Sequence, residues 1–121
     1  MIRIDGKTIK ISRGDSGFIK LTISLSATQK YEFQIGDKVQ LRILEKKNYD
    51  NVVIKKEVII QNICTEVEIN LEEQDTTIGD IVNKPQTFWY EVSLNEIQTV
   101  VGYDDDGPAE FIVYPANGGV K

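Results

Sequence analysis

Apolar and polar residues alternate along most of the chain, and this period of two predicts β-strands that each bury one face. The segment 18–25 shows the pattern most fully, with Ile19, Leu21 and Ile23 on one face and Lys20 on the other. The clearest strands are predicted at residues 18–25, 38–43, 66–71 and 87–94, and less regular ones at 8–12, 52–60, 97–101 and 110–114. Helical periodicity is nearly absent, so we expect an all-β protein.

Glycine, aspartate and asparagine gather between the predicted strands, where they favour tight turns. The turns are expected at residues 13–17, 35–37, 48–51 and 104–108. Short strands separated by turns about ten residues apart are typical of a β-sandwich or a small barrel. Only residues 71–77 have a composition suited to a helical turn, which would carry the chain from one sheet to the other.

The same alternation predicts which side chains form the core. The polar residues between the apolar ones should be exposed to solvent, namely Lys20, Arg42 and Glu68. The core should contain Leu21, Ile23, Leu41, Ile43, Ile69, Tyr90 and Val92.

The chain has 121 residues, which is the size of one ordinary domain. We therefore expect a single sandwich domain over residues 1–121, with 115–121 as a tail or linker. A core of this size is stable without disulfides. The single cysteine, Cys64, excludes an intrachain disulfide and is expected to be a buried thiol in a strand.

The formal net charge of −5 argues against a nucleic-acid-binding protein, which needs a basic surface to neutralise phosphates. Residues 1–60 contain twelve Lys or Arg and seven acidic residues, and residues 61–121 contain two and twelve, so the halves carry +5 and −10. If strands from both halves interleave, this charge cancels within the fold; if they segregate, the domain has two oppositely charged sides. No segment has the apolar length of a membrane span or of a signal peptide, so we expect a protein made in the cytoplasm.

Catalytic chemistry is not expected. The absence of histidine removes the commonest general base and the Ser-His-Asp arrangement, and the glycines stand singly at turns instead of forming a phosphate-binding loop. We predict no enzyme activity and no cofactor. The acidic segment Asp104, Asp105 and Asp106 could offer oxygens to calcium, but it lacks the later bidentate glutamate of the helical calcium motif, and an acidic hairpin tip is favoured.

Two further features could mediate binding. Arg13-Gly14-Asp15-Ser16 spells a tetrapeptide that integrins recognise, although Gly and Asp also lie where a turn requires them, and we favour the turn. Trp89, Tyr103 and Tyr114 would be interface anchors if they are exposed, because large aromatic side chains dominate binding hot spots; each is equally suited to the core.

In chain order, several segments resemble small structural proteins of the tail and baseplate modules of phages that infect Gram-positive bacteria. The similarity extends from residue 11 to residue 114, through segments 11–17, 31–39, 71–76, 88–94, 98–101 and 110–114. The chain is also similar to the N-terminal domain of siphophage upper baseplate proteins. Two features differ: those proteins continue into a stalk and trimerising region, whereas this sequence stops at Lys121, and the Asp104 to Asp106 loop is not typical of them.

The resemblance implies an immunoglobulin-like antiparallel β-sandwich of about seven to eight strands. It also implies a virion structural role, as a separate tail component or a prophage remnant, with other tail proteins or copies of itself as partners. No catalytic or ligand residue carries over from the resemblance, and the charge and the apolar run lengths predict no nucleic-acid or membrane partner. The alternative is an adhesion or carbohydrate-binding module with the same fold, which would use the exposed aromatic residues or the Arg13 to Ser16 turn.

Overall fold

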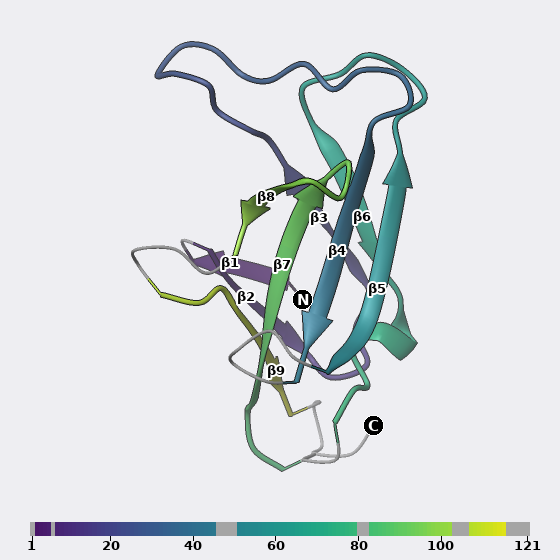
Figure 1. Ribbon diagram of the computed structural model, residues 1–121. Helices are drawn as coiled ribbons and strands as arrows, with labels where there is room; N and C mark the ends of the chain where they lie inside the picture. Colours follow the sequence, from purple (N-terminus) through teal and green to yellow (C-terminus); the bar gives the residue numbers. More distant parts are fainter. Residues whose placement is uncertain (1, 6, 46–50, 80–82, 103–106, 116–121) are drawn as a thin grey trace.

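The computed structural model describes residues 2–5, 7–45, 51–79, 83–102 and 107–115, and nearly all of its regular structure is β-strand (Figure 1). One sheet has seven strands. Six of them lie side by side in the order β1 (Ile2–Asp5), β2 (Thr8–Ser12), β9 (Glu110–Tyr114), β7 (Gln86–Leu94), β4 (Lys38–Leu44) and β5 (Val52–Ile59). The seventh, β8 (Gln98–Val101), pairs with β7. The second sheet contains β3 (Gly17–Leu21) and β6 (Val67–Leu71). The all-β sandwich expected from the alternation is confirmed.

The strand order follows a known arrangement. The strands β5, β4, β7 and β9 take the places of C′, C, F and G in an immunoglobulin-like sandwich, and β3 and β6 take the places of B and E. Two details differ from the expectation. The strand β2 runs parallel to β9, so the large sheet is mixed instead of purely antiparallel. The structure also has β1, a strand of four residues that is not among the strands predicted from the sequence.

The predicted core is largely confirmed. Leu21, Leu41, Ile43, Ile69, Tyr90 and Val92 are all buried in one cluster between the two sheets. Ile23 is a correction, because it is only half-buried. The strand β3 ends at Leu21, two residues earlier, and the Ile23 carbonyl accepts a hydrogen bond from the Tyr31 amide within the following loop.

Arg42 is a second correction, since it is half-buried instead of fully exposed. It does point away from the core, but it forms an ion pair across strands with Glu91 of β7. This contact shields part of both side chains on the outer face of the large sheet.

The two halves of the chain interleave, and their charges therefore cancel within the fold. The strand β4 lies beside β7, β2 beside β9, and β3 beside β6. Among the described residues, ion pairs join cations of the first half to acids of the second, namely Lys20–Glu66, Lys38–Glu96, Arg42–Glu91 and Lys56–Asp75. Of the two arrangements considered for the charges, the structure shows the interleaved one.

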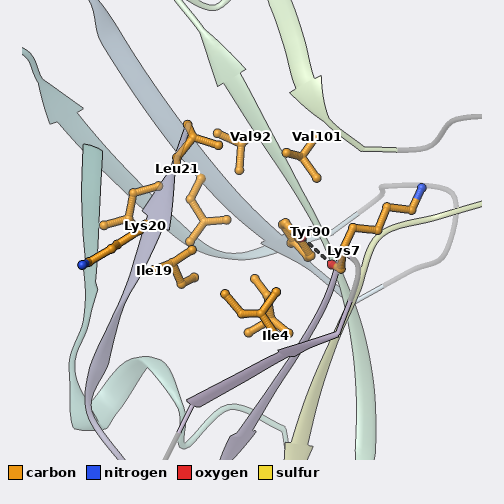
Figure 2. Close-up of a pocket in the computed structure, with 11 residues that line it drawn as sticks. Ile4, Lys7, Ile19, Lys20, Leu21, Tyr90, Val92 and Val101 are labelled. Carbon is orange, nitrogen blue, oxygen red and sulfur yellow. Dashed lines mark hydrogen bonds between the residues drawn. The ribbon is translucent and has the colours of Figure 1, made fainter. Parts of the chain in front are cut away.

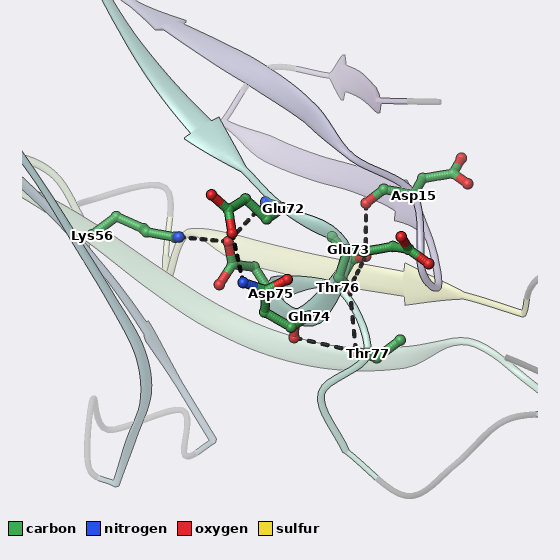
Figure 3. Close-up of polar contacts among 8 residues, drawn as sticks. All are labelled: Asp15, Lys56, Glu72, Glu73, Gln74, Asp75, Thr76 and Thr77. Atoms are coloured by element: carbon green, nitrogen blue, oxygen red, sulfur yellow. Dashed lines mark hydrogen bonds and ion pairs between the residues drawn. The ribbon is translucent and has the colours of Figure 1, made fainter.

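The helical turn expected near residues 71–77 is present as a short 3₁₀ turn, η1 (Glu73–Asp75) (Figure 3). The Asp75 carboxylate is buried; it accepts a hydrogen bond from the Glu72 amide and lies 2.7 Å from the Lys56 ammonium group. The Thr76 hydroxyl donates to the Asp15 carbonyl at 2.7 Å. The turn η1 is thereby tied to β5 on one side and to the loop before β3 on the other.

Candidate docking surface

Three loops meet at one end of the sandwich, at the upper ends of β7 and β5 in Figure 1. Residues 22–37 connect β3 to β4, residues 60–66 connect β5 to β6, and residues 95–97 connect β7 to β8. This end of the molecule is where the fold brings separate loops together.

These loops expose a group of aliphatic side chains. Ile97 is 90% exposed and Ile35 is 70% exposed. In the described part of the chain nine large apolar side chains are exposed, and five of them belong to this end: Leu25, Ile35, Ile59, Ile63 and Ile97. Single exposed apolar residues are ordinary, but a group of them marks an interaction surface. We call these five residues the apolar loop end.

The carboxylate of Asp37 holds two of the loops together. Its Oδ2 accepts hydrogen bonds from the Tyr31 hydroxyl at 2.7 Å and from the Gln34 amide at 2.9 Å. Its Oδ1 accepts one from Asn95 Nδ2, in the turn between β7 and β8, at 3.1 Å. The Gln34 amide, followed by the other two donors, lowers the pKa of Asp37 below its usual value, and the bond to the carboxylate raises the pKa of Tyr31.

Backbone bonds connect the third loop. Phe33 and Cys64 form an isolated antiparallel bridge, with the Phe33 amide donating to the Cys64 carbonyl at 2.7 Å. Phe33 itself is fully buried and packs edge-on against Tyr31, with ring centres 5.2 Å apart. Cys64 therefore corrects the expectation of a buried thiol in a strand, because it is half-buried and lies in a loop. The three loops form one cross-linked unit.

The turn between β7 and β8 has an unusual backbone. Asn95 and Glu96 both have positive φ angles, of 55° and 64°, and the Ile97 amide donates to the Leu94 carbonyl. A two-residue turn of this kind favours Asn at the first position but glycine at the second, so Glu96 carries strain. The ammonium nitrogen of Lys38 lies 3.4 Å from Oε1 of Glu96, and this ion pair helps to fix the turn. The turn places the side chain of Ile97 in solvent.

Two of the aromatic residues proposed as anchors, Trp89 and Tyr114, lie away from the apolar loop end. Trp89 is half-buried on the outer face of the large sheet, midway along β7 and opposite Leu44 in register. Tyr114 is half-buried at the far end of β9, with the Arg3 guanidinium 5.9 Å from its ring centre. Tyr103 and the acidic residues Asp104, Asp105 and Asp106 lie outside the described residues. The apolar loop end was not predicted from the sequence. The signal that could have indicated it is the presence of single isoleucines within turn-forming segments, such as Ile35 before Gly36.

The tetrapeptide turn has a structural role. Gly14 has a φ of +82°, a conformation that glycine adopts without strain. Arg13 is only 7% exposed, and its guanidinium donates hydrogen bonds to the carbonyls of Ile78 and Gly79 at 2.8 and 2.9 Å. The arginine that an integrin would need to contact is therefore buried against the loop after η1.

Two hollows were considered as binding sites. A cavity of about 160 Å³ between the sheets has mainly aliphatic walls, and Lys7 extends its ammonium group away from it (Figure 2). The Tyr90 hydroxyl at its wall donates to the Lys7 carbonyl, so the cavity presents few groups for specific recognition. A polar groove on the outer face of the large sheet contains Arg42, which pairs with Glu91, and Gln40, which donates to Glu57.

Within the described ranges, no cluster of three or more Cys, Asp or Glu side chains is placed to hold a metal ion. The same part of the chain contains no helix that is long and apolar enough to cross a membrane. No protein family model, no curated protein and no solved structure matches this sequence.

Proposed function

We propose that this chain is a non-enzymatic docking component of a phage or prophage virion, in the tail or baseplate, and that it binds a neighbouring virion protein through the apolar loop end. The observation that carries the proposal is the gathering of Leu25, Ile35, Ile59, Ile63 and Ile97 at one end of the sandwich. The resemblance of segments 11–114 to tail and baseplate proteins supplies the class of partner.

The energetics of docking favour this end. Burying exposed apolar area is the main source of association free energy, and interface centres are depleted of charged residues. Association also costs free energy when loops must be ordered. Here the Asp37 hydrogen bonds and the Phe33–Cys64 bridge order the loops before any partner arrives. The surface is therefore both apolar and preorganised.

The adhesion alternative is less well supported. Its first contact, the Arg13 to Ser16 turn, has a buried arginine. Its second contact, the aromatic residues, includes Trp89 and Tyr114, which are half-buried and separate from each other along the strands. A glycan-binding role would use the outer polar groove, in which the Arg42 guanidinium is already paired with the Glu91 carboxylate.

The test is incorporation into particles. Virion production is induced in host cells that carry either the wild-type gene or a variant gene, Ile35→Asp or Ile97→Asp. The amount of this chain in the purified particles is then measured by mass spectrometry. Phe18→Asp is the matched control, since Phe18 is exposed on β3 away from the loop end. We expect wild type and control in the particles and at least a tenfold loss of the loop-end variants, although their melting temperatures are unchanged. Particles that lack the wild-type chain would refute the proposal.

A further inference from the structure

The strand β5 forms one edge of the large sheet, at the right of Figure 1. It pairs with β4, and among the described strands none pairs with its other edge. An edge strand of eight residues exposes a row of backbone donors and acceptors that can pair with another chain. Proteins often block such edges with lysine, and β5 contains two, Lys55 and Lys56.

The outer face of β5 has a symmetric pattern. In order along the strand it carries Val53, Lys55, Glu57 and Ile59, which are all exposed. The two ends of the row are apolar and exposed by 37% and 45%, and the middle holds one positive and one negative charge. A row of this kind is complementary to itself when it is turned end to end.

One antiparallel register uses this complementarity. With a two-fold axis through Lys56, Val53 of each copy lies opposite Ile59 of the other, and Lys55 lies opposite Glu57. A shift by two residues in either direction places Lys55 opposite Lys55 or Glu57 opposite Glu57, and like charges in cross-strand pairs are destabilising. Shifts by one residue would place a core-facing side chain opposite an outward-facing one. The charges therefore favour a single register.

The second lysine does not block this register. Lys56 points toward the interior side of the sheet, where its ammonium group lies 2.7 Å from the buried Asp75 carboxylate (Figure 3). In the paired register two copies of Lys56 meet at the axis, each with its own carboxylate. The positive charges at the axis are thus locally neutralised.

We propose that two copies of this chain associate edge to edge through β5, in the antiparallel register centred on Lys56, so that their large sheets become one continuous sheet. This pairing goes beyond the docking proposed above, because it uses the free edge of β5 and a second copy of the same chain. Ile59, at the end of β5, is the one residue that the two surfaces share. Its partner is specified by the alternation and charge of β5 itself.

Sedimentation equilibrium over a concentration series tests the pairing. The wild-type chain is compared with variants in which the charges of Lys55 and Glu57 are reversed. Lys55→Glu alone and Glu57→Lys alone each replace two attractive cross-strand pairs by two repulsive ones, so each should weaken the dimer at least about tenfold. Mixing the two variants in equal amounts restores opposite charges in a heterodimer, and the double variant Lys55→Glu/Glu57→Lys restores them in a homodimer. Lys20→Glu, on β3, is the matched control for a change in net charge and should leave the dimer unchanged.

Association that is lost in both single variants and recovered in the mixture and in the double variant supports the pairing. A wild-type chain that is monomeric throughout the series overturns it, as does a dimer that neither single variant weakens. Circular dichroism and thermal melting verify that each variant is folded. Ile97→Asp should dimerise like wild type, so failure of the β5 pairing and failure of docking at the loop end are separate results.

Discussion

Replacement of Asp37 by alanine tests whether one carboxylate holds the loop end together. The change removes three hydrogen bonds, from the Tyr31 hydroxyl, the Gln34 amide and the Asn95 side chain. Hydrogen bonds to charged groups contribute about 1.5–3 kcal/mol each when they are buried, but at this partly exposed site water can replace some of them. We therefore expect a total loss of about 2 kcal/mol in the free energy of unfolding, or about 6–10 °C in melting temperature.

The pH dependence of this loss provides the sharper assay. Folding lowers the pKa of Asp37, so the stabilisation from its ionised carboxylate is fully present above the pKa in the unfolded chain, which is about 4. This stabilisation is lost as the pH falls through the lower pKa of the folded chain. In urea unfolding, the stability difference between wild type and Asp37→Ala should be largest near pH 7 and should shrink as the pH falls below about 4. Tyr31→Phe removes only one of the bonds and should cost about 0.5–1.5 kcal/mol at pH 7. Equal stability of Asp37→Ala and wild type at pH 7 would show that the carboxylate does not stabilise the loop end. A stability difference that stays constant as the pH is lowered would show that the ionised form of Asp37 is not the stabilising one.

Other predictions concern the core, the tetrapeptide turn and the tyrosine. Leu41→Ala should destabilise the fold by about 2–5 kcal/mol in urea unfolding, and Ile23→Ala by clearly less, because Leu41 is fully buried and Ile23 is not. Gly14→Val should cost about 1–3 kcal/mol, since valine is strained at the positive φ of this position; an unchanged melting temperature would show that the turn adapts. The Tyr31 hydroxyl should ionise at higher pH than a free tyrosine in an ultraviolet titration, and this shift should become smaller in Asp37→Ala.

The sequence predicted the strands well because a sheet with one buried face imposes a period of two on the residues themselves. The ranges of β2 and β9 are those expected, and the helical turn appears as η1. The end of β3 was misplaced, because the alternation through Ile23 and Leu25 continues into a loop whose path is set by contacts with Tyr31 and Gln29. The alternation indicates which side chains could face a core, but it does not indicate where the pairing with the neighbouring strand ends.

The candidate docking surface was less accessible to prediction than the fold. Its residues come from three loops that are distant in the sequence, and only the strand topology brings Ile35, Ile63 and Ile97 to one end. The role of Asp37 was hidden for the same reason, because one of its donors, Asn95, lies 58 positions away. The burial of Arg13 likewise depends on a loop more than sixty positions along the chain. These are long-range contacts that no local pattern encodes.

The most direct test of the account is oxidative footprinting of the chain, free in solution and within purified particles. Docking through the apolar loop end predicts that the side chains of Leu25, Ile35, Ile63 and Ile97 react readily in the free chain and are protected in the particle, whereas the exposed Phe18 keeps its reactivity. Unchanged reactivity of the apolar loop end in particles that contain the chain would contradict docking through this surface.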